Sequence, residues 1–457
     1  MVAIVAWSLG LALSLSFWPG IMIWDSGRQY AQALSGQFDD WHPPLMECIW
    51  RAFIPLMPGP VPMLILQLGV YGAALGLLAY RTWQDGHRHQ AAWLAATGLF
   101  PPTLLVMATV IKDSLMAAML LAAFVLLGRG NRLSRFIGVG LILIASCLRF
   151  NAFLAGLPLL LMAMPRTGHR AGRRIRTALV IAGATAVLLL VMPAVNRLLE
   201  AKRSGVELSL VIFDLGGIAA HGGGNAFPPM AVKNPIAVNQ SCYLAERWDS
   251  YSWWVDPVCP IRFVTVSAAF TRQHINPELF WIKAIAAHPL AYAAHRLDHW
   301  NIASQFLVRK VGERWIISAS DPNEWGFRVA PNLANRLVTS AVWAVNATPF
   351  GWPCWWLALS FGLVMLGSRL PHSRQLLVLA SSALLYDLGY LPLSVAAELR
   401  YYCWPMMATL IATVMLVGRW RETQVALRPG AVHQMLAAAP LVLVTIVGLG
   451  WRWLGAA

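Results

Sequence analysis

A carboxylate stands directly after the first apolar run of the chain, where it could act as a base at the boundary between water and lipid. The run at 3–23 is followed at once by Trp24-Asp25-Ser26. At such a boundary a carboxylate can take a proton from an acceptor hydroxyl while a lipid-borne substrate approaches from the bilayer. The other interpretation is that Asp25 caps a helix that begins at Ser26. We favour a catalytic role, because two further acids and a histidine follow in the same loop.

These residues form the segment Asp39-Asp40-Trp41-His42-Pro43-Pro44. Two adjacent carboxylates are hard oxygen ligands of the kind that Mg²⁺ or Mn²⁺ prefers, so a divalent cation held by Asp39 and Asp40 is a candidate cofactor. A pair of this kind before two prolines also forms turns, so the metal site is one of two interpretations. We expect Asp40 and His42 to orient a substrate beside Asp25.

Three cations occupy equivalent places on three other hairpins: Lys112, Arg149 and Arg400. Each stands at the end of an apolar run, where it could be a snorkelling interface anchor. Arginine, however, presents a donor fork that matches phosphate oxygens, and converging cations would stabilise the charge on a departing phosphate. Their sequence neighbours complete the candidate substrate-binding set, namely Asp113, Asn151, Glu398 and Tyr401.

The elements that must position these groups are membrane-spanning helices. Of the 457 residues, 58% are hydrophobic and only 12% are charged, whereas soluble proteins average about 25% charged residues. Apolar runs near the length of a span predict an all-α polytopic protein with about eleven transmembrane helices. These runs are 3–23, 61–80, 91–110, 114–128, 136–148, 152–164, 177–195, 352–367, 375–396, 401–417 and 434–453.

The net charge of +15 has its own explanation in the placement of the arginines. Five short loops carry half of them, with Asp85 and Glu422 as their only acids, while the alternate loops carry Asp25, Asp39, Asp40, Glu47, Asp113 and Glu398. The positive-inside rule places the Arg-rich loops in the cytoplasm and the acid-bearing loops outside. We therefore expect a multi-pass protein of a bacterial inner membrane, with the candidate site facing the periplasm and no nucleic acid as partner. The arginines are Arg81, Arg88, Arg129, Arg132, Arg135, Arg166, Arg170, Arg173, Arg174, Arg176, Arg369, Arg374, Arg419, Arg421 and Arg428.

Three parts of the chain follow from this topology. We expect an N-terminal transmembrane module at 1–195 with a catalytic first outer loop at 24–60, an extracytoplasmic insert of mixed helix and loop at 196–351, and C-terminal transmembrane helices at 352–457. Within the insert, 332–350 is expected to lie on the membrane surface. Cys242 and Cys259 both fall in the insert and could form a disulfide or remain free.

Two weaker features lie elsewhere. His295 and His299 share a helical face, but no further metal-ligand motif accompanies them. Asp387 falls inside an apolar run, where an acid is a functional hypothesis by default or pairs with a neighbouring helix.

Taken together, the motifs resemble the GT-C superfamily of integral membrane glycosyltransferases. The resemblance rests on Asp25 after the first span, on a first outer loop that ends near His42-Pro43-Pro44, on Lys112-Asp113, and on Arg400-Tyr401. It implies a polytopic enzyme that uses polyprenyl-phosphate-linked sugars, as protein O-mannosyltransferases and the lipid A aminoarabinose transferase do. By resemblance, Asp25 is the catalytic acid of the first loop, and Lys112 and Arg400 hold the carrier phosphate. The chain departs from the mannosyltransferases in having Asp25-Ser26 where they have Asp-Glu.

We therefore expect an inverting hexosyl- or pentosyltransferase of cell-envelope polysaccharide synthesis, which moves a sugar from a polyprenyl-phosphate donor to a glycan, lipid or protein acceptor. One alternative is an enzyme similar to O-antigen ligases or polymerases, which would use a polyprenyl-pyrophosphate glycan. The other is a non-enzymatic transporter of lipid or sugar. A transporter would carry polar residues through the depth of the bilayer, whereas here most of them gather at one face.

Overall fold

The computed structural model describes residues 1–163, 173–312, 314–424 and 428–454. In these ranges the chain is helical and forms no strand beyond isolated bridges. It divides into two compact units, which are described separately. Unit 1 comprises Met1–Arg203, Ile316–Leu388 and Leu399–Ile446, and unit 2 comprises Ser204–Trp315, Gly389–Glu398 and the chain from Val447 onward.

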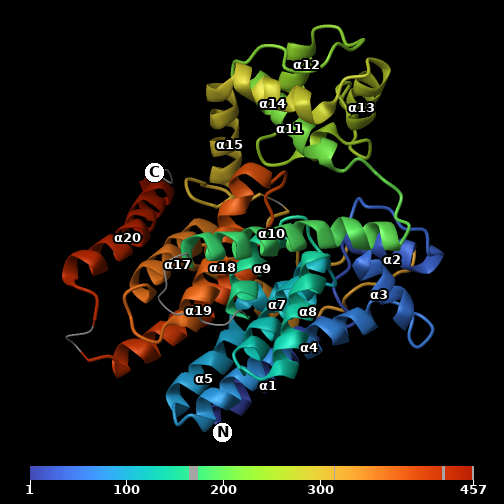
Figure 1. Cartoon of the computed structure of the whole chain (residues 1–457). Coiled ribbons are helices and arrows are strands. Elements are labelled where there is room, and N and C mark those ends of the chain that lie inside the picture. The colour runs from blue at the N-terminus through green and yellow to red at the C-terminus, as the bar shows by residue number, and fades with distance from the viewer. Residues whose placement is uncertain (164–172, 313, 425–427, 455–457) are drawn as a thin grey trace. The chain divides into compact units, whose positions relative to one another are not determined.

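Unit 1 contains the N-terminal helices and most of the C-terminal ones (Figure 1). Its helices are α1 (Val2–Leu15), α2 (Trp24–Ser35), α3 (Leu45–Phe53), α4 (Val61–Gln84), α5 (Arg88–Ala96), η1 (Thr97–Leu99), α6 (Pro101–Ala108), α7 (Lys112–Leu127), α8 (Arg132–Ser146), α9 (Ala152–Met162), α10 (Arg173–Leu198), α16 (Leu333–Asn346), η3 (Pro349–Gly351), α17 (Pro353–Gly367), η4 (Leu399–Tyr402) and α19 (Cys403–Glu422). Two further helices, α18 (Arg374–Leu393) and α20 (Ala431–Leu454), belong to unit 1 up to Leu388 and Ile446.

Five helices of the described residues are long and apolar enough to cross a membrane: Val61–Gln84, Thr177–Leu198, Arg374–Leu393, Leu399–Glu422 and Ala431–Leu454. A sixth span results if Arg88–Leu99 and Pro101–Ala108, which meet at a bend of 55°, count as one. The chain thus has the apolar helices of a membrane protein, but the predicted number of eleven spans is too high. The reason is that several apolar runs form helices shorter than a span, among them Val2–Leu15, Ala152–Met162 and Pro353–Gly367.

Helix α7 forms the core of unit 1. Its sequence is apolar on all sides, and nearly every residue of it is buried, as expected for a helix surrounded by others. It packs against α4, α8 and α9 and also contacts α19. The interruption before it, at Thr109, is stabilised by Gln67 of α4, whose side-chain amide donates hydrogen bonds to the carbonyls of Met107 and Thr109. This pairing fixes where α7 begins, and therefore where Lys112 stands.

Of the predicted Arg-rich loops, Arg166 and Arg170 lie outside the described residues, as do the side chains of Arg173, Arg174 and Arg176. The segment that was expected to lie on the membrane surface forms α16, which packs on α6 and α1.

Unit 2 contains α11 (Glu207–Ala220), α12 (Pro235–Cys242), η2 (Trp248–Tyr251), α13 (Phe263–Arg272), α14 (Pro277–Ala287) and α15 (Pro289–Ala303). A disulfide joins Cys242 to Cys259. Of the two states left open for these cysteines, the structure has the bonded one.

A buried polar network connects α11 with α14 and α15 in unit 2. The carboxylate of Asp214, which is fully buried, accepts hydrogen bonds from Trp281 Nε1 at 2.8 Å and His295 Nε2 at 3.1 Å, and it pairs with Arg296 at 2.5 Å. Burial lowers the pKa of His295, so its ring is neutral, and its Nδ1 accepts from the Tyr243 hydroxyl at 2.8 Å. Because the Asp214 carboxylate meets donors from both α14 and α15, we interpret this network as the polar core of unit 2.

Candidate functional site

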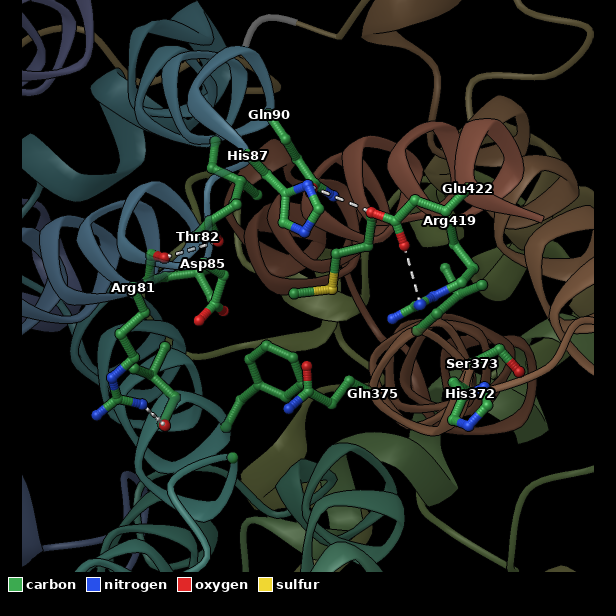
Figure 2. Close-up of a pocket in the computed structure, with 17 residues that line it drawn as sticks. Arg81, Thr82, Asp85, His87, Gln90, His372, Ser373, Gln375, Arg419 and Glu422 are labelled. Atoms are coloured by element: carbon green, nitrogen blue, oxygen red, sulfur yellow. Dashed lines mark hydrogen bonds and ion pairs between the residues drawn. The ribbon is translucent and has the colours of Figure 1, made fainter.

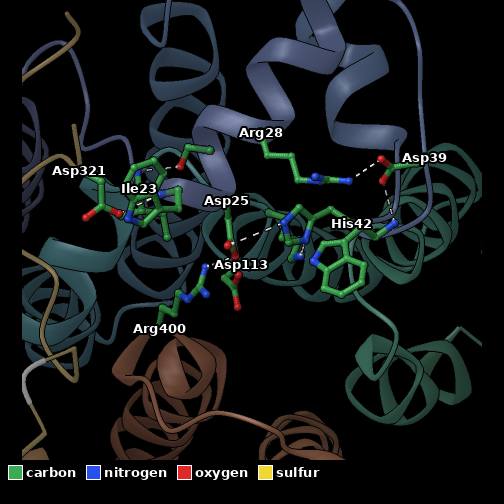
Figure 3. A network of polar contacts seen from close by, with 12 residues as sticks. Ile23, Asp25, Arg28, Asp39, His42, Asp113, Asp321 and Arg400 are labelled. Carbon is green, nitrogen blue, oxygen red and sulfur yellow. Dashed lines mark hydrogen bonds and ion pairs between the residues drawn. The ribbon is translucent and has the colours of Figure 1, made fainter. Parts of the chain in front are cut away.

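The predicted site residues of unit 1 converge from five separate segments of the chain. Asp25 opens α2, His42 comes from the loop before α3, and Lys112 opens α7. Arg149 comes from the turn before α9, and Arg400 belongs to η4. Hydrogen bonds, ion pairs and a shared aromatic ring connect these side chains in pairs. Figure 3 shows Asp25 between His42 and Arg400, with Asp113 beside them.

Backbone pairing places Asp25 next to the start of α7. The N–H of Ile21 donates to the carbonyl of Ala108 at 3.1 Å, and the N–H of Val110 donates back to the carbonyl of Ile21 at 2.9 Å. One residue into α2, the hydroxyl of Ser26 donates to the Val110 carbonyl at 2.6 Å. Since α2 and α7 therefore begin side by side, Asp25 and Lys112 lie close enough for their charges to interact.

A segment far along the chain, which contains Ser320 and Asp321, also contacts the start of α2. The carboxylate of Asp321 accepts the Trp24 N–H at 2.9 Å, and the Asp321 N–H donates to the Met22 carbonyl at 2.8 Å. Ser320 Oγ accepts the Met22 N–H at 3.0 Å. An acid at the first N–H groups of a helix satisfies donors that have no partner inside the helix. We call the segment 316–330 the strap, because it fixes the residues on either side of Ile23 and so sets the position of Asp25.

The central pair of the site is an aspartate held by an arginine. Arg400 Nη1 donates to Asp25 Oδ2 at 2.8 Å, and His42 Nε2 lies 3.8 Å from Asp25 Oδ1. The Arg400 side chain is 8% exposed and that of Asp25 is 26% exposed, so solvent can still reach the carboxylate. Burial alone would raise the pKa of Asp25, but the nearby positive charges, Arg400 first and also Lys112, hold it well below its usual range. Asp25 is thus an anion.

His42 links this pair to Lys112. The Lys112 ammonium hydrogen-bonds to His42 Nδ1. Because a lysine ammonium can only donate, Nδ1 is the acceptor, and the ring proton lies on Nε2, facing Asp25. Burial, followed by the Lys112 charge, lowers the pKa of His42, which keeps the imidazole neutral. Burial also lowers the pKa of Lys112, to about 8, although Asp25 works against that shift.

The third cation belongs to a second ion pair beside the first. Arg149 pairs with Asp113, whose side chain is 1% exposed, and its Nε donates to Asn151 Oδ1 at 3.4 Å. The ring of Tyr401 lies against both arginines, with its centroid 4.5 Å from the Arg149 guanidinium carbon and 5.1 Å from that of Arg400. Tyr401 therefore connects the two ion pairs, and each arginine gains a cation–π contact.

Two of the remaining predicted residues, Asp39 and Asp40, contact residues outside this cluster. Asp39 pairs with Arg28 at 2.5 Å, and the N–H of Asp40 donates to the carbonyl of Lys202 at 3.0 Å. In the part of the chain that the structure describes, no group of three His, Cys, Asp or Glu side chains could hold a metal ion, so the Asp39–Asp40 metal site stays a prediction. Glu398 belongs to unit 2, and its substrate-binding role also stays a prediction.

Sequence reasoning did not single out Glu47 or Asp321. Glu47 lies on α3 and is fully buried. Burial raises its pKa to about 8, although Gln29 and Lys112 work in the opposite direction. The sequence carries a signal for Glu47, since it is the one acid of a short amphipathic helix rich in apolar residues. It carries none for Asp321, which comes close to Trp24 only through the tertiary fold.

Asp387, which was expected inside an apolar run, lies buried in α18 at 1% exposure. Its carboxylate oxygens accept no hydrogen bond from the described residues.

No model of a known protein family matches the chain, and neither a curated protein nor a solved structure matches it significantly.

Proposed function

We propose that the chain is an integral membrane glycosyltransferase that moves a sugar from a polyprenyl-phosphate donor to an acceptor hydroxyl, with inversion at the anomeric carbon. The observation that carries this proposal is the pair of Asp25 and Arg400, backed by His42 and Lys112. A partly exposed carboxylate supplies a base, and the adjoining cations supply the charge that a leaving phosphate requires.

The reaction would be a single displacement. Asp25 takes the proton of the acceptor hydroxyl as that oxygen attacks the anomeric carbon of the sugar. The bond between this carbon and the phosphate oxygen breaks, and its electron pair leaves with the polyprenyl phosphate. Arg400 and Lys112 neutralise the leaving group, and attack from the opposite side inverts the anomeric configuration.

Donor binding would also activate the base. Arg400, when paired with Asp25, holds it as a weak base, because a nearby cation stabilises the carboxylate. A donor phosphate competes for the same guanidinium, since Arg binds phosphate oxygens with two donors. As Arg400 turns to the phosphate, the pKa of Asp25 rises toward its ordinary value. The carboxylate thus becomes a better base only when a donor is present, which limits wasteful chemistry.

A donor comparison tests this proposal. The full-length protein, purified in detergent, is incubated with undecaprenyl-phosphate sugars, and free undecaprenyl phosphate is measured by mass spectrometry with water or a short glycan as acceptor. We expect release from the monophosphate donors. In a parallel incubation with undecaprenyl-pyrophosphate glycans, release of undecaprenyl pyrophosphate from these donors alone would instead favour the ligase-like alternative. Movement of lipid-linked sugar across proteoliposomes without any covalent product would favour a transporter, and either result would contradict the proposal.

A further inference from the structure

The stretch of chain just before Arg400 belongs to a different unit from Arg400 itself. Residues 389–398 are part of unit 2, whereas α18 up to Leu388 and η4 from Leu399 are part of unit 1. We call 394–398, which runs from the end of α18 to the start of η4, the connector. Arg400 follows the connector after a single residue, so the contacts that hold the connector also limit where Arg400 can lie.

An arginine of α15 holds the first residue of the connector. Arg296 Nη1 donates to the Ser394 carbonyl at 2.7 Å, while Arg296 Nη2 pairs with the Asp214 carboxylate at 2.5 Å. The guanidinium carbon also lies 5.9 Å from the ring centroids of both Phe213 and Tyr292. Arg296 and Ser394 are buried, at 3% and 4% exposure. One planar guanidinium thus joins the buried carboxylate of unit 2 to the backbone of the connector.

A second anchor for the connector lies in the loop that the disulfide of unit 2 closes. The N–H of Trp248 in this loop donates to the Val395 carbonyl at 2.8 Å. Its neighbour Arg247 forms an isolated antiparallel bridge with Ala396. The connector is therefore held in unit 2 at three consecutive residues, by α15 at the first and by the disulfide-closed loop at the next two.

This anchoring restricts the backbone of Arg400. A step of four residues spans at most about 14 Å even when fully extended, so the Cα of Arg400 stays within that distance of the Cα of Ala396. Ala397 and Leu399 between them are buried, at 5% and 4% exposure, so the intervening chain is packed rather than slack. A displacement of Ser394 or Ala396 is therefore passed along the chain to η4.

The restriction matters most when a donor is bound. In the proposed function the donor phosphate draws Arg400 away from Asp25, and the 2.8 Å hydrogen bond between these two side chains is lost. The guanidinium is then fixed by the ring of Tyr401, which belongs to the same short helix, and by the backbone of that helix. Both depend on the connector that leads into η4.

We propose that Arg296 is a positioning residue for Arg400: by holding the Ser394 carbonyl, it fixes the chain that presents the Arg400 guanidinium to the donor phosphate. This inference rests on the proposed function and deepens it. It gives the polar network of unit 2 a role beyond the stability of that unit, because Asp214 at its centre holds Arg296 in turn.

The variant Arg296→Lys of the full-length protein in detergent tests the proposal. Lysine keeps a positive charge beside Asp214 but lacks the planar fork that also reaches the Ser394 carbonyl. We expect the KM for an undecaprenyl-phosphate sugar to rise about ten-fold with a much smaller change in kcat, because a misplaced Arg400 weakens donor binding. Amide hydrogen exchange, measured by mass spectrometry, should become faster at 395–402.

The matched control is Arg419→Lys, near the far end of the helix that follows η4. Arg419 also pairs with an acid, Glu422, at 3.0 Å, and both line the cavity shown in Figure 2. It lies about 24 Å along α19 from Cys403, so the same substitution there should leave the KM and the exchange at 395–402 unchanged. An equal rise of the KM in Arg419→Lys would overturn the proposal.

An unchanged KM in folded Arg296→Lys would limit Arg296 to the core of unit 2 and overturn the proposal, even if exchange in α11 and α15 became faster. If Arg296→Lys fails to fold, as its thermal unfolding would show, the decision passes to Ser394→Ala. That variant removes the 2.9 Å hydrogen bond from Ser394 Oγ to the Ala396 carbonyl and leaves the polar network intact. Its KM must then rise about two-fold or more, and an unchanged KM would overturn the proposal.

Failure of the proposed function gives a different result. The unaltered protein would then release no undecaprenyl phosphate. In that case exchange at 399–402 decides alone whether Arg296 fixes the position of Arg400, with faster exchange in Arg296→Lys supporting the connection and unchanged exchange overturning it.

Discussion

At the scale of single residues, the site pairs a base with the cation that would later hold the leaving group. Arg400 lies 2.8 Å from Asp25 and 5.1 Å from the ring centroid of Tyr401, so it is already fixed in place before any substrate arrives. A guanidinium held in this way needs little rearrangement to accept phosphate oxygens. Lys112 differs, because burial lowers its pKa, so that its charge changes within the ordinary pH range.

The titration of Lys112 predicts an alkaline limit to turnover. Burial lowers the pKa of Lys112 to about 8. Lys112 therefore carries its positive charge below that pH and loses the charge as the pH rises through it. If its charge holds the donor phosphate, turnover falls on the alkaline side with a midpoint near that value, as a profile of kcat/KM against pH would show.

The matched variant for this prediction is Lys112→Arg, which keeps its charge throughout the measurable range. We expect its alkaline limb to disappear, even if the maximal rate is lower. If Lys112→Arg still shows the alkaline fall in kcat/KM, that fall is caused by another group.

Glu47 makes a prediction about stability. Its pKa is raised to about 8 by burial, whereas an unfolded glutamate titrates near about 4.3. The folded state therefore keeps a proton that the unfolded state releases, and stability is lost as the pH rises from the lower value to the higher one. Glu47→Gln should remove that loss and raise the unfolding temperature at pH 8 by about 5 °C. Parallel pH dependences in the two proteins would contradict the assignment.

At the scale of elements, the site depends on where α2 and α7 begin. The pairing of Ile21 with Ala108 and Val110 aligns the two helix starts, and the strap secures α2 from the other side. The aromatic rings of Trp325 and Phe327 in the strap pack against Tyr30 of α2, with centroid separations of 4.9 and 5.7 Å. The strap thus contacts α2 at its first turn and again along its length.

Removal of the Asp321 carboxylate tests this function of the strap. Asp321→Ala leaves the Trp24 N–H without its acceptor, so the first turn of α2 should loosen. We expect faster amide hydrogen exchange at Trp24 and a fall of about ten-fold in kcat, with little change in KM. The matched control is Glu324→Ala, an exposed acid of the same segment. Faster exchange with an unchanged kcat would limit Asp321 to a structural role.

The sequence alone predicts which residues belong to the site better than it predicts which of them contact one another. Asp25, Lys112, Arg149 and Arg400 each stand where a polar turn adjoins an apolar run, and that shared position was enough to group them. Their pairing was not predictable, because the separations of 375 residues between Asp25 and Arg400 and 70 between His42 and Lys112 are decided by packing. The strap contacts from Ser320 and Asp321 arise for the same reason.

At the scale of the whole molecule, the charge pattern was more informative than the apolar runs. Residues from four of the Arg-rich loops line one cavity, and residues from the acid-bearing loops meet at the other end of α7. The number of spans was less predictable, because an apolar run does not show where Pro101 bends the chain or where a helix ends short of a span.

Labelling of single cysteines tests the resulting topology in cells. Gln37→Cys lies in the first loop beside the site and His89→Cys lies in the first Arg-rich loop, and both positions are exposed. By the positive-inside rule, a membrane-impermeant maleimide should label Gln37→Cys in intact cells and His89→Cys only after permeabilisation. The unaltered chain gives the background of its own cysteines. If both variants are labelled from the same side of the membrane, the assignment of these two loops to opposite sides is contradicted.

The measurement that tests the central claim most directly is the initial rate of undecaprenyl phosphate release by Asp25→Asn. The amide keeps the size of the side chain but cannot take a proton, so we predict a rate about 10²- to 10⁴-fold below that of the unaltered protein. Asp85→Asn, which removes a carboxylate at the opposite end of α7, should retain the full rate. Release at the unaltered rate by a folded Asp25→Asn protein would contradict the account.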